Sequence, residues 1–193
     1  MKSRNAFITI LLLLIFASLN LYASENNIRY LTGFIKEVDN NLITFTNNLV
    51  WQADRNVTAV SMQPVVIILE DDRNEGYLYI KNERVNVTLM QKSNTTGNNS
   101  YMPALYDGLS VYNTGQLKDI TSINITKSSI TLDANDVYYV NSDEDKETLS
   151  KWNENIDVVL TKNGTSIRIT NVVTAEYINV TTTPNFATDN KAE

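Results

Sequence analysis

The chain has 193 residues, with 16 Lys and Arg against 22 Asp and Glu, a formal net charge of -6, and neither histidine nor cysteine. The absence of these two residue types excludes the commonest zinc ligands and the Ser-His-Asp and Cys-His catalytic systems. A nucleic-acid-binding protein would need a basic face, which this acidic sequence does not supply, so we expect no nucleic-acid partner. Because His and Cys are absent, we also expect no metal and no cofactor.

Residues 1–23 are predicted to be a secretory signal peptide. Lys2 and Arg4 precede an apolar stretch over 6–19, and Ala23 supplies a small residue at which a signal peptidase would cut. The alternative is an uncleaved anchor, because the apolar stretch approaches the roughly 20 residues that span a bilayer. An exported chain without disulfides is typical of a bacterial envelope protein. We therefore predict a periplasmic or secreted protein that has no membrane contact after cleavage.

The rest of the sequence contains two copies of one β-rich unit. The phrase "YLTGFIKEVD" at 30–39 is echoed by "YNTGQLKDIT" at 112–121. Downstream of these phrases stand "ITF" and "ITL", and six residues beyond each lies an aromatic residue, Trp51 or Tyr138. The stretch "PVVIILEDDRNEGYLYIKN" then corresponds to "IDVVLTKNGTSIRITN". This order of similar stretches predicts an internal repeat.

Alternating β-branched and aromatic residues, separated by Asn, Gly and Asp, predict strands joined by hairpins. Asn163-Gly164 predicts a type I′ turn, and Gly33 and Gly115, which interrupt strand patterns, predict bulges or bends. The predicted fold is all-β, with two tandem, small five-stranded antiparallel barrels of SH3-like or OB-like type. The predicted boundaries are a signal peptide over 1–23, a first barrel over 24–91, a polar linker and lead-in over 92–108, a second barrel over 109–181 and a flexible tail over 182–193.

One short helix is predicted in the second copy. Ser142 precedes Asp145 by three residues, which is a variant of the capping box. Leu149 and Trp152 share one face of this helix and would cover an end of the barrel. The first copy has the shorter stretch "RNVTAVSMQP" at the corresponding place, where we expect at most one helical turn. Between the copies, residues 92–100 are small and polar, so we expect separable units joined by a pliable segment.

The order of features in one copy resembles small exported bacterial modules of unknown function. These features are a strand, an "I-T-L" stretch, a polar turn before "V-W" or "V-Y", a short helix that carries Trp, and an Asn-Gly hairpin. The resemblance covers Ile130 to Asn171 and, less completely, Ile43 to Asn82. It implies a β-barrel repeat module and brings no active residues and no function.

Aromatic residues are the candidate binding residues, because the chain holds ten Tyr and two Trp. Exposed aromatic side chains suit a glycan or a protein partner. Three tyrosines are assigned to the surface on strand alternation: Tyr77, Tyr79 and Tyr139. Three other aromatic residues are predicted to lie in the core: Trp51, Tyr138 and Trp152.

We predict a non-catalytic exported module that binds a protein or an envelope component, such as a glycan. One alternative is a carboxylate-dependent, glycan-active hydrolase, for which Glu37 and Asp119 recur at one position of the repeat. Another is a membrane-anchored structural spacer. Calcium would suit the acidic stretches at 70–76 and 143–147. Neither stretch has EF-hand spacing, and a solvated turn and a helix start explain them.

Overall fold

The computed structural model of this chain describes residues 27–70, 74–92, 101–103, 113–133 and 135–184. The predicted signal peptide over 1–23, the segment 93–100 of the predicted linker and the tail beyond 184 lie outside the described residues. Within the described ranges, no helix has the length and apolar character needed to cross a membrane.

The first half of the chain forms seven strands: β1 (Asn27–Asp39), β2 (Leu42–Phe45), β3 (Val50–Ala53), β4 (Pro64–Leu69), β5 (Glu75–Ile80), β6 (Glu83–Lys92) and β7 (Tyr101–Pro103). Six of them pair in the order β1-β2-β3-β6-β5-β4, and β4 pairs back onto β1. They therefore close into an antiparallel barrel, which we call the first ring. The short β7 pairs with the end of β6 outside this ring.

The second half forms six strands and a short helix: β8 (Asn113–Asn124), β9 (Ser129–Leu132), β10 (Asp136–Val140), α2 (Asp143–Leu149), β11 (Asp157–Asn163), β12 (Ser166–Asn171) and β13 (Tyr177–Thr181). Their pairings follow the order β8-β9-β10-β13-β12-β11, and β11 pairs back onto β8. We call this the second ring. The predicted all-β class is confirmed. The prediction of five strands in each barrel is not confirmed, because six strands close each ring of pairings.

Each ring encloses its own hydrophobic core. Trp51 is 0% exposed among the aliphatic side chains of the first ring, and Tyr138 and Trp152 are 5% and 6% exposed in the second. The structure therefore confirms the prediction that these three aromatic residues lie in the core. The Nε1 atom of Trp152 donates a hydrogen bond to Oε2 of Glu176 at 3.3 Å.

The helix α2 begins as the sequence predicts. The Oγ atom of Ser142 accepts a hydrogen bond from the backbone N–H of Asp145 at 3.0 Å, which caps the first turn. Leu149 is fully buried and packs with Trp152 in the core of the second ring. In the first ring, the corresponding residues 54–63 contain no helical turn. The difference in helix content between the two halves is therefore as predicted.

Replacing Trp152 with alanine is expected to destabilise the protein by about 3 to 5 kcal/mol, the range for large-to-small aromatic changes in a core. The cause is the cavity left between α2 and the strands of the second ring. Urea unfolding of Trp152→Ala and of wild type measures this difference. Val137→Ala, at an exposed position of β10, is the control, and a Trp152→Ala loss no larger than that of the control would contradict the core assignment.

The strand order of the first ring recurs in the second ring, strand for strand. Ile43 lies opposite Trp51 in the pairing of β2 with β3, and Ile130 lies opposite Tyr138 in the pairing of β9 with β10. The sequence comparison of the two copies predicts this correspondence of Ile43 with Ile130 and of Trp51 with Tyr138. The same register therefore holds in both hairpins.

The two similar stretches that first indicate the repeat, 30–39 and 112–121, do not occupy corresponding positions in the two rings. The bulge in β1 lies between Ile35 and Glu37, and the bulge in β8 lies between Ile120 and Ser122. Ile35 thus corresponds to Ile120, and not to Leu117 as the likeness of the two phrases indicates. Ile35 and Ile120 are both fully buried, so core packing, rather than the resemblance of letters, sets the register.

Gly33 and Gly115 are not the bulge residues that the sequence predicts. Each lies where another side chain comes close to the backbone. A Cβ atom at Gly33 would lie 2.7 Å from Cδ2 of Phe45, and one at Gly115 would lie 2.5 Å from Cγ1 of Val159. The two glycines therefore permit close packing, and the bulges occur at other residues.

The type I′ turn occurs in a different hairpin from the predicted one. Asn163 is the last paired residue of β11, so the central residues of that turn are Gly164 and Thr165, and only Gly164 has a positive φ, of +60°. This is the pattern of a type II′ turn. Positive φ at both central residues occurs between β5 and β6, at Lys81 and Asn82. The prediction of a hairpin is correct, and its turn type is wrong.

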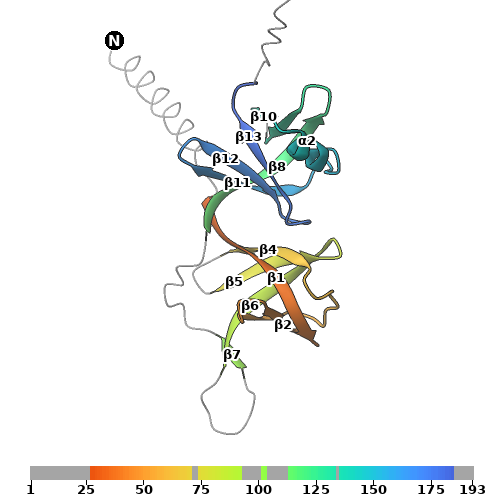
Figure 1. Ribbon diagram of the computed structural model, residues 1–193. Helices are drawn as coiled ribbons and strands as arrows, with labels where there is room; N and C mark the ends of the chain where they lie inside the picture. Colours follow the sequence, from red (N-terminus) through yellow and green to blue (C-terminus); the bar gives the residue numbers. More distant parts are fainter. Residues whose placement is uncertain (1–26, 71–73, 93–100, 104–112, 134, 185–193) are drawn as a thin grey trace, which may run out of the picture.

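The first parts of β1 and β8 pair with each other and join the two rings. The pairs are Asn27 with Gln116, Ile28 with Gly115, Arg29 with Thr114 and Tyr30 with Asn113. Arg29 and Thr114 hold corresponding positions in the two rings, so the pairing is symmetric about them. Figure 1 shows these two strand ends meeting between the rings. The arrangement is the one that two subunits of a symmetric dimer would adopt.

A third apolar cluster lies between the rings and draws on both of them. Its buried members are Tyr30, Val66, Ile68, Tyr77, Val159 and Val172. The hydroxyl group of Tyr30 also forms a hydrogen bond with Oγ1 of Thr161 at 2.8 Å. The strands β11, β8, β1 and β4 are therefore continuous across the junction. The linker is not the sole connection between the two predicted units.

A cut within 93–100 is expected to leave one particle, because strand pairing and the shared cluster hold the rings together. A protease site placed in this segment, followed by size-exclusion chromatography of the cleaved chain, measures the association. Leu117→Asp, which puts a carboxylate against the shared cluster, should release two smaller particles after the same cut. Separation of the cleaved wild-type chain into two species would show that the junction is too weak to hold.

Candidate binding groove between the two rings

The three tyrosines assigned to the surface lie in two separate places. Tyr77 on β5 is only 5% exposed, because the second ring covers it. Half-buried Tyr79 packs edge-on against Tyr77, with 6.1 Å between ring centroids. Tyr139 is half-buried on β10, opposite Ser129 and Thr181. The surface assignment of Tyr77 is therefore wrong, and a binding role for the three residues stays a prediction.

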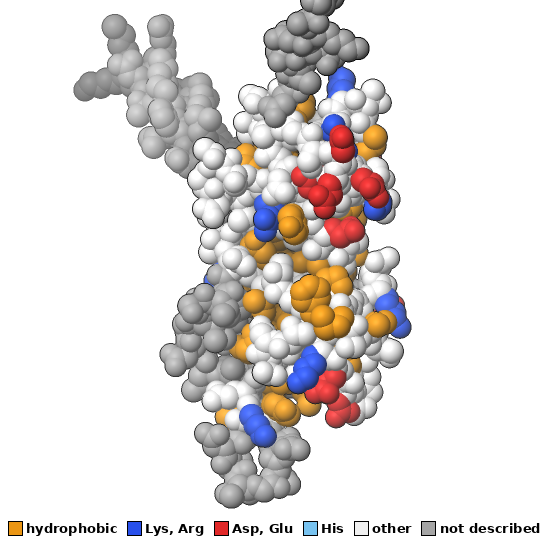
Figure 2. Space-filling model, viewed as in Figure 1, with side chains coloured by type: hydrophobic (Ala, Val, Ile, Leu, Met, Phe, Trp, Pro, Cys, Tyr) orange, Lys and Arg blue, Asp and Glu red, His pale blue; other side chains and the backbone are white. Residues whose placement is uncertain are grey.

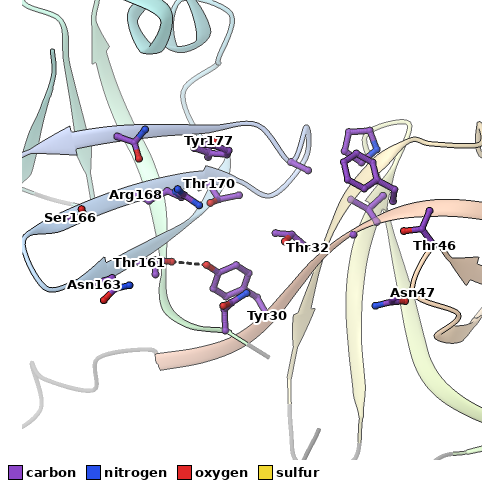
Figure 3. A pocket seen from close by; sticks show the side chains of 17 residues that line it. Tyr30, Thr32, Thr46, Asn47, Thr161, Asn163, Ser166, Arg168, Thr170 and Tyr177 are labelled. Carbon is purple, nitrogen blue, oxygen red and sulfur yellow. Dashed lines mark hydrogen bonds between the residues drawn. The ribbon is translucent and has the colours of Figure 1, made fainter. Parts of the chain in front are cut away.

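A groove of about 680 Å³ lies beside the junction, and residues of both rings line it (Figure 3). We call it the junction groove. On one side, Tyr30 and Thr32 project from β1, with Asn47 from the turn after β2. On the other side, β11, β12 and β13 of the second ring contribute side chains that include Arg168 and Tyr177. The hydrogen bond between the Tyr30 and Thr161 hydroxyl groups ties these two sides together.

The junction groove is polar without being acidic. Hydroxyl groups come from Thr32, Thr46, Thr161, Ser166 and Thr170. Side-chain amides come from Asn47, Asn113, Asn163 and Asn179. Of the described residues that line the groove, Arg168 alone carries a charge. In a chain with a net charge of -6, the groove thus carries a formal charge of +1 among its described lining residues and is rich in hydrogen-bonding groups.

The guanidinium group of Arg168 lies over an aromatic ring. Its guanidinium carbon is 4.1 Å from the ring centroid of Tyr177. Tyr177 lies on β13 two residues before Asn179, which is the direct strand partner of Arg168. Tyr177 is 49% exposed, and Phe34 on the opposite side of the groove is 47% exposed. A guanidinium stacked in this way keeps its in-plane N–H donors available. Among the described residues, Arg168 has no ion-pair partner.

A second groove, of about 500 Å³, uses the corresponding strands on the other side of the β1–β8 pairing. Here the arginine and the tyrosine have exchanged positions. Tyr77 on β5 corresponds to Arg168 on β12, and Arg84 on β6 corresponds to Tyr177 on β13. The guanidinium carbon of Arg84 is 3.9 Å from the ring centroid of Tyr77. Arg84 also pairs with Glu70, whose counterpart in the junction groove is Asn163. The two grooves therefore share a framework and differ in whether the arginine over the tyrosine ring has an acidic partner.

Two positions that carry hydroxyl groups in the junction groove are aliphatic in the second groove. Ile68 takes the place of Thr161, and Leu117 takes the place of Thr32. Burial, followed by the nearby charge of Asp157, raises the pKa of Tyr77 to about 12, so this tyrosine stays neutral at ordinary pH. The second groove has fewer groups available for a polar ligand. The junction groove is therefore the better candidate binding site.

Away from the junction groove, two carboxyl groups lie next to each other. Asp119 on β8 is paired with Asp157 at the start of β11. Burial, together with the hydrogen bond and charge of Asp119, raises the pKa of the Asp157 carboxyl above its ordinary range, while Arg84 opposes this shift. Asp119 is thus adjacent to a carboxyl group that sequence reasoning did not consider. The Glu37 carboxylate, which it did consider, lies beyond the bulge of β1, on the part that pairs with β2.

Sequence reasoning missed Arg168 and Tyr177. Strand alternation in "TSIRITN" places Arg168 on the same face as Ser166 and Thr170, and few basic residues occur in this acidic chain. Those two signals could have marked Arg168 as an exposed cation among hydroxyl groups. The groove itself requires the pairing of β1 with β8, for which no local signal exists.

Figure 2 shows where the charged side chains gather on one face of the molecule. Acidic side chains cluster over the part of the second ring around α2, whose first turn holds Asp143, Glu144 and Asp145. Hydrophobic side chains gather where the two rings meet. The surface thus divides into an acidic region at α2 and a less charged zone at the junction.

No protein-family model, no curated protein and no solved structure matches this chain.

The raised pKa of Asp157 predicts how stability depends on pH. A carboxyl whose folded pKa lies above its unfolded value, near 3.8 for Asp, supports folding fully below that unfolded value. This contribution is lost as pH rises through the folded pKa. Asp157→Asn should therefore gain stability relative to wild type as pH rises from 3 to 7, measured by urea unfolding at each pH. Glu37→Gln is the control for loss of one carboxylate, and an equal pH-dependent gain in both variants would contradict the assignment.

Proposed function

We propose that this protein is an exported, non-catalytic binding module built from two copies of one small β-barrel, and that it binds a component of the bacterial envelope in the junction groove. The observation that carries the proposal is the lining of this groove. Hydroxyl groups, amides, two exposed aromatic rings and one guanidinium converge there from both rings, and no carboxylate is among the described lining residues. This is the composition of a site that holds a polar ligand.

Three observations support the view that the two halves are copies. The rings have the same strand order, the same register in their second hairpins, and a junction that is symmetric about Arg29 and Thr114. A single barrel that paired with a second copy of itself would make the same contact. Fusing two copies retains the contact and leaves each groove free to acquire different side chains.

The hydrolase alternative receives less support from the carboxyl groups. Glycoside hydrolases hold their two carboxyl groups about 5 Å or more apart, on either side of the bond that is cleaved. Asp119 and Asp157 instead lie directly opposite each other on neighbouring strands, where Asp119 helps to raise the pKa of the Asp157 carboxyl, and they do not line the junction groove. The groove offers hydrogen bonds and ring contacts but no acid and base pair among its described lining residues. These features favour binding over hydrolysis.

The test is to retain envelope components from the producing cell on immobilised protein. Wild type is expected to retain a component that Thr32→Trp does not, because an indole at this exposed position of β1 would fill the groove. The expected loss is at least about tenfold in affinity, equivalent to about 1.4 kcal/mol. Thr121→Trp, at an exposed position on β8 outside the groove, is the matched control and should retain the component.

Equal retention by Thr32→Trp and wild type would place binding elsewhere on the surface. Retention of nothing by the wild-type protein would count against a binding module of this kind.

A further inference from the structure

The chemistry of the ligand follows from comparing the two grooves. Both contain an arginine stacked on a tyrosine, at corresponding positions and in opposite order. In the second groove the arginine, Arg84, is paired with the carboxylate of Glu70. In the junction groove Asn163 replaces that glutamate, and Arg168 has no ion-pair partner among the described residues. The second groove thus contains the carboxylate that the junction groove lacks.

A carboxylate on a ligand would complete the junction groove electrostatically. A guanidinium binds a carboxylate through two parallel hydrogen bonds, and the contact with Tyr177 restricts the positions that the Arg168 side chain can take in advance. The chain as a whole is acidic, so a carboxylate on a ligand would be repelled from much of the surface and attracted to Arg168, which has no ion-pair partner among the described residues. Charge complementarity therefore indicates an anionic group at this place.

The remaining lining indicates that this carboxylate belongs to a sugar chain. Hydroxyl and amide side chains supply both donors and acceptors, which match the alternating hydroxyl groups of saccharides. Tyr177 and Phe34 expose ring surface to the groove, and aromatic rings pack against the apolar faces of sugars. A peptide added as a strand would need a free sheet edge, whereas β11 and β12 each have a paired strand on both sides.

We propose that the junction groove binds a glycan that contains uronate residues, with Arg168 paired to a sugar carboxylate and Tyr177 and Phe34 in contact with sugar rings. This inference rests on the proposed function, because it takes the junction groove to be the binding site. It adds to the proposed function the class of ligand, a glycan that contains uronate residues, and the residue that selects this ligand, Arg168. The second groove is expected to bind the same glycan less tightly, because Glu70 pairs with Arg84 and the aliphatic Ile68 and Leu117 replace two hydroxyl-bearing residues.

The experiment measures binding of oligosaccharides of galacturonate, glucuronate and mannuronate by calorimetry, with neutral galactose and glucose oligosaccharides of equal length beside them. Wild type should bind at least one uronate series, more weakly as salt is raised, and should bind the neutral series at least about tenfold less tightly. Arg168→Gln should weaken uronate binding by about 10- to 100-fold, the loss expected for a hydrogen bond to a charged group.

A second variant introduces into the junction groove the ion pair of the second groove. Asn163→Glu places a carboxylate within reach of Arg168, since residue 163 lies two positions beyond Thr161, the direct partner of Arg168. It should reduce uronate binding about as much as Arg168→Gln does. Gln91→Glu adds the same charge on β6 next to β7, at the end of the first ring away from the junction, and should bind like wild type. Both groove positions are exposed, so unchanged melting curves are expected for all variants.

The outcomes separate the ligand class from the site. Equal binding of neutral and uronate oligosaccharides, unaffected by Arg168→Gln, would overturn the uronate assignment and leave the groove as a glycan site. Absence of uronate binding, with an envelope component still retained by wild type and lost in Thr32→Trp, would overturn this inference and leave the proposed function standing. Uronate binding that Asn163→Glu and Gln91→Glu weaken equally would show a general charge effect and overturn the role of Arg168.

Discussion

The pairing of β1 with β8 is the contact on which the rest of the molecule depends. Each strand contributes its second part to one ring and its first part to the junction. Because the pairing is centred on Arg29 and Thr114, it sets the two rings in a symmetric relation and brings β11 and β12 beside β1. The shared apolar cluster and both grooves follow from this placement. Four residue pairs thus determine where every side chain of the candidate site lies.

A symmetric framework does not require symmetric chemistry, and the two grooves illustrate this. An arginine lies over a tyrosine ring in each, yet Arg84 of the second groove is paired with Glu70, whereas Arg168 of the junction groove has no ion-pair partner among the described residues. In a dimer of identical chains, any substitution would alter both grooves at once. In one chain, the substitutions at positions 70 and 163 are independent. On the proposed function, this independence would let one groove acquire binding residues while the other keeps its internal ion pair.

Local signals in the sequence correctly predicted the features that depend on neighbouring residues. The cap at Ser142, the buried Trp51 and the all-β class all follow from short-range patterns. Features that depend on distant contacts were missed or misplaced. Alternation correctly put Tyr77 on the outer face of its strand, but only the docking of the second ring buries it. For the same reason the site at Arg168 was not found.

The distance in sequence between β1 and β8 also affects the order in which the molecule forms. Hairpins such as β2–β3 and β11–β12 close short loops, whereas the junction must close a loop that spans the whole first ring, which costs more chain entropy and takes longer. On the proposed function, a chain that ends before β8, or one whose rings have formed without docking, would lack the junction groove and would not bind the ligand. Binding would then depend on the closing of the junction, and an occupied groove would favour the closed junction.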